Sequence, residues 1–408
     1  MKKQRKDESR RDFLKKSVNG LAGLAVLPTV LGTESQAEPQ GEKKKSKFIT
    51  RKLGKTGLEL PVVSMGVMNS NSPNLVRDAL DAGIVLLDTA HGYQRGRNEE
   101  MIGEVVKDRP RDSYMIATKV EGTPLDRKTG LFTKEAKAGP FLEKFKTSLQ
   151  RLGMDYVEIL YLHSVVKREA VLYDEYMNAM LKLKKEGSVR FIGVSTHSNE
   201  PEVIRAAVDS KVYDVVLTAY NFRQPHLAEL EKEIARAVKA GLGIVAMKTQ
   251  AGVYWDRERQ HQINMKAALK WALQNKNIHT AIPGFTTFDQ LQEDISVLED
   301  LTLTPQEQED LELGRKYGMK GLYCRQCGTC LAQCDKDIDV PTMMRSYMYA
   351  YGYRNLAAAK ETLSAVDLSN VPCSHCSACK VDCAMGFDVK ERIEDIARLK
   401  SVPDDFVV

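Results

Sequence analysis

Eight short apolar runs, alternating with amphipathic segments, constrain the fold of this 408-residue chain more than any other feature of its sequence. Each run is continuously apolar, as buried parallel strands are, and the segments between them repeat apolar residues at helical spacing. Eight such pairs in about 250 residues predict an α/β fold, the (β/α)₈ TIM barrel. The expected strands are Val62–Gly66, Ile84–Asp88, Tyr114–Thr118, Val157–His163, Val189–Ser195, Asp214–Ala219, Gly243–Met247 and Ile278–Ile282.

An open, doubly wound sheet is the alternative for alternating strands and helices. That fold needs a glycine-rich phosphate loop directly after an early strand. The one approximate match, Gly241–Ala246, precedes its strand, so we interpret it as a helix-to-strand turn. A hairpin is expected over Lys47–Pro61, and glycines at 83, 187 and 241 indicate helix ends.

Polar residues follow several of the predicted strands, where a barrel gathers its chemistry. Asp88, Lys119, His163 and Ser195 stand at these ends, and each alone has an ordinary structural explanation. Together with Tyr93, the strand ends Leu86–Tyr93, Ile116–Lys119 and Ile159–His163 resemble the aldo/keto reductase family, as do Gly96–Gly103 and Arg190–Ser195. The resemblance implies a catalytic tetrad of Asp88, Tyr93, Lys119 and His163. It also implies that a small carbonyl compound and its alcohol are interconverted by hydride transfer with a nicotinamide nucleotide.

The chemistry of carbonyl reduction supports these roles. A hydride adds to carbon and a proton to oxygen, so an acid must lie within hydrogen-bond reach of that oxygen. An unperturbed tyrosine has a pKa of about 10. We expect the Lys119 ammonium to lower the pKa of Tyr93. Asp88 would hold Lys119, and His163 would orient the carbonyl or share the proton.

Nucleotide contacts are implied only by the resemblance. It assigns them to Ser195, Thr196, Asn221, Gly284, Thr286, Thr287, Gln290, Glu293 and Asp294. The chain departs from the family at Leu217, where a carboxamide-binding Gln is frequent, and at Thr196-His197. It also has Gly284 and Gln290 where NADP-binding members commonly have Lys and Arg. NAD and NADP therefore both remain open, with NADP favoured by the resemblance.

All eight cysteines lie between Cys324 and Cys383, in two runs of C-x₂-C-x₂-C-x₃-C. This spacing resembles two-cluster bacterial ferredoxins, in which the fourth Cys of each run ligates the other 4Fe-4S cluster. The resemblance implies two mixed sets, although Asp335 and Ala384 replace the usual prolines. Zinc and disulfides are the alternatives, but four Cys packed so closely favour iron–sulfur clusters. The implied sets are Cys324, Cys327, Cys330 and Cys383, and Cys373, Cys376, Cys379 and Cys334.

The first 37 residues have the three regions of an export signal. Ser9–Lys15 contains Arg10-Arg11 and looks like the twin-arginine signal, which carries folded proteins across the bacterial membrane. We expect the twin-arginine machinery as a partner, cleavage near Ala37 and a periplasmic protein. The expected organisation is a signal peptide over 1–37, a linker over 38–47, a barrel over 48–300, and a helical connector with a small, mainly helical ferredoxin-like domain over 301–408.

Composition excludes two classes of function. The net charge of +5 gives no continuous basic field for nucleic acid. No run of eighteen apolar residues occurs, so no permanent membrane span is expected. Two alternatives to the reductase remain: an electron-transfer protein on a degenerate barrel, with a redox partner protein, and a lyase or dehydratase using the same Tyr and Lys without net redox change.

Overall fold

The computed structural model describes residues 48–126, 128–251, 262–317, 324, 326–336, 338–353, 355–366 and 373–407. The predicted signal and linker, residues 1–47, lie outside the described residues.

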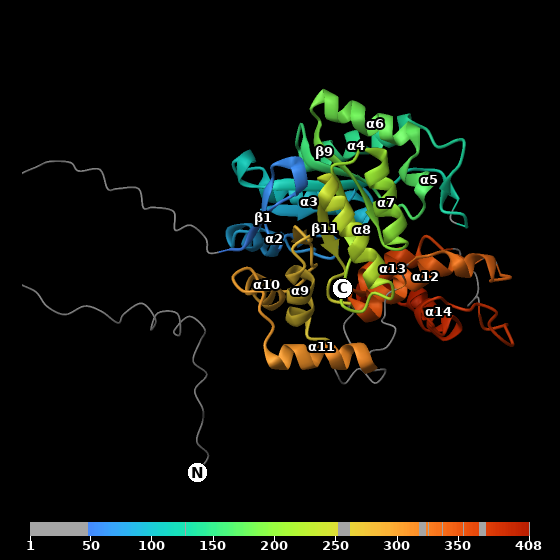
Figure 1. Ribbon diagram of the computed structural model, residues 1–408. Coiled ribbons are helices and arrows are strands. Elements are labelled where there is room, and N and C mark those ends of the chain that lie inside the picture. Colours follow the sequence, from blue (N-terminus) through green and yellow to red (C-terminus); the bar gives the residue numbers. More distant parts are fainter. Residues whose placement is uncertain are drawn as a thin grey trace, which may run out of the picture. The chain divides into compact units, whose positions relative to one another are not determined.

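Eight parallel strands form one sheet in the order β12-β11-β10-β9-β8-β5-β4-β3. A parallel bridge between Val63 and Ala281 joins the two ends of this order, so the prediction of a (β/α)₈ barrel is confirmed (Figure 1). The strands are β3 (Met65–Gly66), β4 (Leu86–Asp88), β5 (Met115–Val120), β8 (Val157–Leu162), β9 (Val189–Thr196), β10 (Val215–Ala219), β11 (Gly243–Met247) and β12 (Thr280–Ala281).

Amphipathic helices surround the strands, each with its apolar face buried. In α4, for example, Phe141, Phe145 and Leu152 repeat at helical spacing and are all buried. Gly187 and Gly241 end α6 and α8 in the left-handed conformation, as the sequence predicts. The barrel helices are α2 (Pro73–Asp81), α3 (Arg97–Val106), α4 (Ala138–Leu152), α5 (Arg168–Val171), α6 (Asp174–Glu186), α7 (Glu200–Ser210), α8 (Leu227–Ala240), α9 (Met265–Gln274) and α10 (Phe288–Ile295).

The predicted N-terminal hairpin is formed by β1 (Thr50–Lys52) and β2 (Glu59–Pro61). Its leucines 53, 58 and 60 pack with Ile159 and Val245 from the strands, so the hairpin contributes to the barrel's inner core. Gly54 has a φ of +54°, and a Cβ there would lie 2.5 Å from the carbonyl oxygen of Gly241. Glycine is therefore needed where the hairpin approaches the barrel backbone.

Short elements complete the barrel. They are the 3₁₀ turns η1 (Gly54–Thr56), η2 (Tyr93–Gly96) and η3 (Arg111–Ser113) and the small antiparallel pair β6 (Leu125–Asp126) and β7 (Leu131–Phe132).

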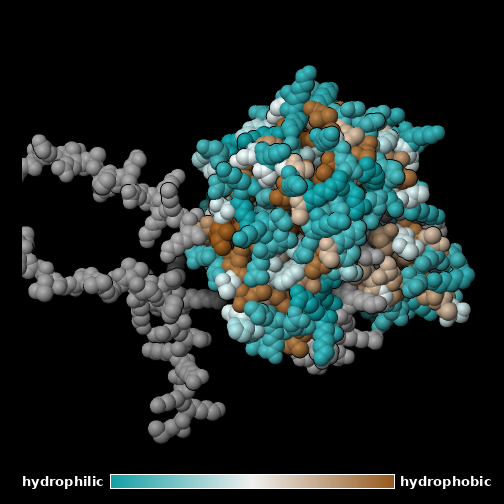
Figure 2. Space-filling model, viewed as in Figure 1, coloured by the Kyte–Doolittle hydropathy of each residue, from teal (hydrophilic) through white to brown (hydrophobic). Residues whose placement is uncertain are grey.

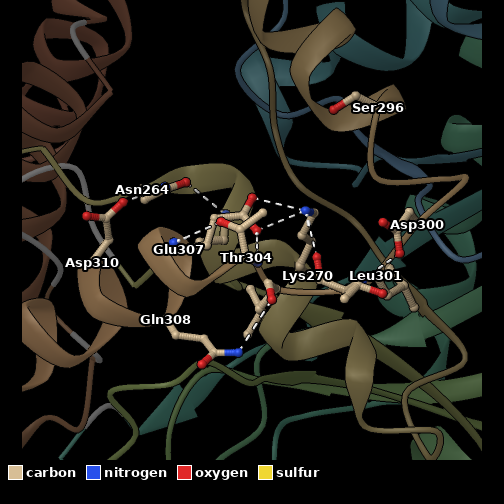
Figure 3. Close-up of polar contacts among 12 residues, drawn as sticks. Asn264, Lys270, Ser296, Asp300, Leu301, Thr304, Glu307, Gln308 and Asp310 are labelled. Carbon is tan, nitrogen blue, oxygen red and sulfur yellow. Dashed lines mark hydrogen bonds and ion pairs between the residues drawn. The ribbon is translucent and has the colours of Figure 1, made fainter.

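A buried ion pair fixes helix α11 (Pro305–Tyr317) to barrel helix α9 (Figure 3). Lys270 Nζ donates to both carboxylate oxygens of Glu307 at 3.0 Å and to the carbonyl oxygen of Thr302 at 2.9 Å. Glu307 also accepts from the backbone N–H of Thr304 at 2.8 Å, while Thr304 Oγ1 accepts from the N–H of Glu307 at 3.1 Å. This capping box starts α11 and holds the connector against the barrel.

The C-terminal helices pack around a small core of their own. Met343 and Leu363 are fully buried there, and Val340 and Ile393 are almost so. The expectation of a small, mainly helical region after the barrel is confirmed (Figure 1). Its elements are η4 (Thr329–Ala332), α12 (Val340–Tyr347), the π-helical turn η5 (Met348–Gly352), α13 (Leu356–Leu363), α14 (Val389–Ala397), η6 (Arg398–Ser401) and η7 (Asp404–Phe406).

The face of the molecule shown in Figure 2 is mainly hydrophilic, with small scattered apolar patches. Among the described residues, the exposed large hydrophobic side chains are Leu181, Phe288, Leu356 and Phe406. No helix in the described ranges has the length and hydropathy needed to cross a membrane.

Candidate active site

Asp88 and Lys119 form a buried ion pair on two neighbouring strands. Asp88 ends β4 and Lys119 is the penultimate residue of β5, and their exposed fractions are 3% and 2%. Lys119 Nζ donates to Asp88 Oδ1 and, at 2.6 Å, to the carbonyl oxygen of Thr89. Burial raises the pKa of Asp88 and lowers that of Lys119, and the attraction between them opposes both shifts. The pair thus places a fixed ammonium at this end of the barrel.

Tyr93 lies directly beside this ammonium. Its hydroxyl oxygen is 3.4 Å from Lys119 Nζ. Burial raises the pKa of Tyr93 well above its ordinary value, and the Asp88 carboxylate adds to that rise. The net direction is therefore opposite to the lowering expected from Lys119, because desolvation of the phenolate is the largest cause of the shift. A phenol in this state keeps its proton at neutral pH.

The residues after Tyr93, including the stretch Gly96–Gly103 that resembles the family, hold the loop that carries Tyr93 in place. Gln94 and Arg95 have φ angles of 50° and 56°, so the loop turns sharply before α3 begins. Asn98 in the first turn of α3 accepts from Thr89 Oγ1 at 2.6 Å, and Glu99 accepts from Thr118 Oγ1 at 2.7 Å. Side chains of α3 therefore tie the Tyr93 loop to Thr118 of β5 and to Thr89, which directly follows β4.

His163 follows β8 and faces Tyr93 edge-on, with ring centroids 5.8 Å apart. Burial lowers the pKa of His163 to about 4, although Glu121 opposes the shift, so the imidazole is neutral near pH 7. The structure thus brings Asp88, Tyr93, Lys119 and His163 together at one end of the barrel, from three neighbouring strands and the loop after the first of them.

A cavity of about 680 Å³ lies beside these residues. Several buried polar atoms around it have no hydrogen-bond partner within the described structure, namely Asp88 Oδ2, His197 Nδ1 and Arg223 Nη1. A concave, mainly apolar site with a few such groups suits a nicotinamide ring and a small carbonyl compound. Its lining comes from the barrel and the C-terminal region, and includes Asp88, Tyr93, His197, Asn221, Lys248, Gly284, Tyr353, Ala384 and Met385.

The residues that the resemblance assigns to nucleotide binding differ in their burial and in their hydrogen bonds. Asn221 and Gly284 line the cavity. Ser195 and Thr196 are fully buried, and their hydroxyls are engaged locally. Ser195 Oγ accepts from the N–H of Ser164 at 2.9 Å, and Thr196 Oγ1 donates to the carbonyl oxygen of Ser198 at 2.6 Å.

The remaining candidates lie at the start of α10. Gln290 Oε1 accepts from the N–H of Thr286 at 2.8 Å, and Thr287 caps the helix by accepting from the N–H of Gln290 at 3.3 Å. These three residues and Glu293 are exposed, whereas Asp294 is buried, and burial raises its pKa well above the ordinary value. The helix start can thus meet an anion from solvent, while Asp294 faces the protein interior.

Sequence reasoning missed two cationic residues of this region. Lys248 directly follows β11 and lines the cavity. The rule that singled out Asp88 and Lys119, a polar residue at a strand's carboxyl end, would have found it. Arg345 lies on α12, and its charge acts on Tyr93, His163 and Lys248. No local signal identifies Arg345, because only packing of the C-terminal region brings it close.

The cysteines fall into the two mixed groups that the resemblance implies. Burial raises the pKa of Cys330 to about 12, and neighbouring Cys324, Cys327 and Cys383 add to the rise. Burial likewise raises the pKa of Cys373 to about 11, with added effects from its neighbours, which are Cys376, Cys379 and Cys334. Each run thus sends its fourth Cys toward the other run.

The surroundings of the first group fit a metal cluster. A small cavity lies among its four cysteines, with Val340, Met344 and Val389 as apolar neighbours. None of the eight cysteines, all of which are among the described residues, is joined in a disulfide. Four thiols around a cavity fit a cluster of several irons better than zinc.

Comparison with known proteins identifies two regions. Residues 65–267 match the model of the aldo/keto reductase family, and residues 323–388 match that of a 4Fe-4S dicluster domain. The uncharacterized oxidoreductase YqkF of Bacillus subtilis is 35% identical over 163 residues, 39% of this chain and 51% of that protein. L-galactose dehydrogenase of Arabidopsis thaliana is 26% identical over 307 residues, 65% of this chain and 93% of that protein.

Solved structures show the same fold. An aldo-keto reductase from Bacillus halodurans, in its holo form, superposes with a TM-score of 0.52 and 23% identity, over 66% of this chain and 97% of that one. Matches to the Bacillus subtilis relatives are shorter, since the chain spans about half of YqkF and 40% of the aldo-keto reductase YhdN. The barrel nevertheless matches the family model over the strands that carry the candidate site, so residues 65–267 form an aldo/keto reductase domain, and a 4Fe-4S dicluster domain follows over residues 323–388.

Proposed function

We propose that the protein is an NAD(P)-dependent oxidoreductase that interconverts a small carbonyl compound and its alcohol. The observation that carries this proposal is the convergence of Asp88, Tyr93, Lys119 and His163 beside one cavity. A buried ion pair is costly to desolvate, and an inert scaffold would gain nothing from such a pair next to a tyrosine. The intact arrangement favours the reductase over an electron-transfer protein on an inert scaffold.

Each residue has a role that follows from its surroundings. The nucleotide, when bound, supplies or accepts the hydride. Tyr93 holds a proton at neutral pH and donates it to the carbonyl oxygen in the reductive direction. Lys119, fixed by Asp88, stabilises the phenolate that remains. His163 is neutral and orients the carbonyl oxygen by hydrogen bonding.

The nucleotide is proposed to extend from the cavity to the start of α10. Asn221 and Gly284 would border the nicotinamide end, and Thr286, Thr287 and Gln290 would bind phosphate through the helix N-terminus. Ser195, Thr196, Glu293 and Asp294 remain candidate contacts on family grounds. The segment 283–295 contains no Lys or Arg, so it has no cation for a 2′-phosphate. Both NADH and NADPH must therefore be tested.

Two 4Fe-4S clusters are proposed as further cofactors. The grouping of the cysteines into sets of four supports crossed ligation. The ligands would be Cys324, Cys327, Cys330 and Cys383 for one cluster, and Cys373, Cys376, Cys379 and Cys334 for the other. A redox partner protein is needed only if these clusters exchange electrons outside the chain.

Titration of the purified holoprotein with NADH and NADPH tests the function. We expect fluorescence quenching on binding, and oxidation of the bound nucleotide when a carbonyl substrate from a small panel is added. Product formation without nucleotide consumption would instead favour a lyase. Failure to bind either nucleotide, in protein with intact clusters, would contradict the proposal and favour an electron-transfer protein.

We also propose that the protein is exported to the periplasm by the twin-arginine route. The domain boundaries proposed are a signal over 1–37, a linker over 38–47, a barrel over 48–300 and the C-terminal region over 301–408.

Replacing Arg10 and Arg11 by Lys should retain the protein in the cytoplasm with its clusters assembled. Fractionation followed by iron analysis checks this, and Lys16→Arg serves as a control for a basic change outside the motif. Normal delivery of the double variant to the periplasm would show that another signal is used.

A further inference from the structure

The loop that carries Tyr93 has an unusual backbone conformation. Gln94, Arg95 and Gly96 have φ angles of 50°, 56° and 94°, so three successive residues lie in the left-handed region. Residues other than glycine rarely adopt this conformation, and it persists where surrounding contacts hold it. The position of the Tyr93 hydroxyl therefore depends on the contacts that Gln94 and Arg95 make.

These two residues contact different parts of the chain. Gln94 Nε2 donates to the carbonyl oxygen of Met68 at 2.9 Å, which is a contact within the barrel. Arg95 Nε forms an ion pair with Glu361 Oε1 at 2.8 Å, and Arg95 Nη2 donates to Ser364 Oγ at 2.8 Å. Glu361 is in α13 and Ser364 directly follows that helix, so the C-terminal region contacts the loop.

The packing of α13 places Glu361 at this contact. Ala359 and Leu363 are fully buried in the core of the C-terminal region. Glu361 is two residues from each of them, which on a helix puts it on the opposite side. Its second carboxylate oxygen pairs with Arg97, the first residue of α3, at 3.4 Å. One carboxylate thus joins the two arginines that flank Gly96 to the C-terminal region.

The distance between Tyr93 and Lys119 makes the position of this loop important for the proposed reaction. The Tyr93 hydroxyl oxygen is 3.4 Å from Lys119 Nζ, which is long for a hydrogen bond. Lys119 is fixed by its buried ion pair, so movement of the loop changes this distance. Even a small misplacement of a catalytic group lowers the rate steeply.

We propose that Glu361 is a positioning residue, which acts through Arg95 to hold the Tyr93 hydroxyl beside Lys119. The inference rests on the proposed oxidoreductase function and adds a part of the C-terminal region to its site. Residues of that region, including Tyr353 and Met385, also line the cavity. Full turnover therefore requires α13 to be docked against the Tyr93 loop, and this requirement involves no electron transfer through the clusters.

The substitution Glu361→Gln tests the inference because it removes the charge and nearly keeps the size of the side chain. With the holoprotein and 4-nitrobenzaldehyde as the probe, we expect kcat to fall by about tenfold, since a misplacement of about 1 Å can cost about 10²-fold. Nucleotide affinity, iron content and unfolding temperature should stay near wild type, because ion pairs of exposed side chains contribute little to stability and Arg95 is 66% exposed. Glu361→Asp should be intermediate.

A double substitution and a matched control identify the contact. Arg95→Gln combined with Glu361→Gln should be no slower than Glu361→Gln alone, because both changes remove the same contact. Lys360→Gln is the control on the same helix. Lys360 Nζ contacts the carbonyl oxygen of Val402 and the carboxylate of Asp404, which are both in the C-terminal region, so this variant should keep the wild-type kcat.

Hydrogen exchange reports on the loop without any substrate. Peptides that cover residues 93–97 should exchange faster in Glu361→Gln than in the wild type or in Lys360→Gln. The same peptides show whether a cysteine variant still has α13 docked. A loss of kcat in protein whose loop remains protected has a cause other than this contact.

Three results would overturn the inference. They are wild-type kcat or unchanged loop exchange in Glu361→Gln, an equal fall of kcat in Lys360→Gln, and a multiplied loss of kcat in the double variant. A wild-type protein that binds neither NADH nor NADPH would instead overturn the proposed function. The exchange measurement would still decide whether Glu361 holds the loop.

Discussion

Tyr93→Phe is expected to lower kcat by about 10²- to 10⁴-fold, the usual contribution of a positioned acid. The substitution removes the hydroxyl 3.4 Å from Lys119 Nζ and leaves the ring in its contact with His163. Nucleotide affinity should stay near that of the wild type, because the phenol acts on the carbonyl oxygen. Steady-state kinetics and the fluorescence titration measure the two quantities separately.

A matched control removes a different hydroxyl near the same cavity. Tyr349→Phe removes a long contact with the sulfur of Met68 and leaves the hydroxyl of Tyr93 in place, so its effect on kcat should be small. Turnover retained by Tyr93→Phe would show that another group protonates the carbonyl.

The pH dependence follows from the raised pKa of Tyr93. A group whose pKa is raised stays protonated as the pH increases through neutrality, so carbonyl reduction should not decline between about pH 6 and 8. Alcohol oxidation needs the deprotonated phenol, and its rate should increase with pH over the same range. His163, with a pKa of about 4, stays neutral there and contributes no transition.

Loss of the second cysteine group is expected to destabilise the C-terminal region severely. The double substitution Cys376→Ser and Cys379→Ser removes two of four proposed ligands. Bound metal contributes roughly 10 kcal/mol or more in small metal-dependent domains. The local core is small and includes the buried Cys373. We expect a lower yield, a lower unfolding temperature and about half of the iron, measured by calorimetry and metal analysis.

The same variant tests whether this cluster takes part in turnover. Hydride transfer moves two electrons together, whereas a 4Fe-4S cluster passes one, so direct exchange between nucleotide and cluster is unfavourable. Protein that survives purification should therefore keep its kcat, and Ser377→Ala in the same loop should resemble the wild type in every measurement. A collapse of kcat with the barrel still folded would contradict a structural role and favour electron transfer to a partner. Electron paramagnetic resonance after adding substrate alone would then detect a reduced cluster.

The first cysteine group stands closer to the proposed chemistry. Ala384 and Met385, which follow Cys383, line both its small cavity and the larger one beside Tyr93. The charge of Cys324 also acts on Lys248. Variants of this group would therefore disturb the candidate site itself, which is why the second group gives the cleaner test.

Features that depend on local pattern could be predicted from the amino-acid sequence. Apolar runs placed the eight strands, because a strand buried on both faces must be apolar at every position. Asp88, Lys119 and His163, which stand at or next to the ends of these strands, were expected together because parallel strands bring their carboxyl ends to one face. The cysteine spacing indicated clusters because close thiolates in this pattern are their usual ligands.

Features that depend on burial and on contacts between distant segments became visible only in the folded protein. The pKa of Tyr93 rises because desolvation outweighs the nearby Lys119, and no sequence pattern records how deeply a phenol is enclosed. Ser195 and Thr196 stand at the end of a strand as predicted, yet their hydroxyls bond to neighbouring backbone groups. Arg345 lies 252 positions after Tyr93, and only the packing of the C-terminal helices against the barrel brings its charge to that residue. The local spacing of apolar residues predicts helices and strands. The free energy of a charge, in contrast, depends on every group that surrounds it in the folded protein.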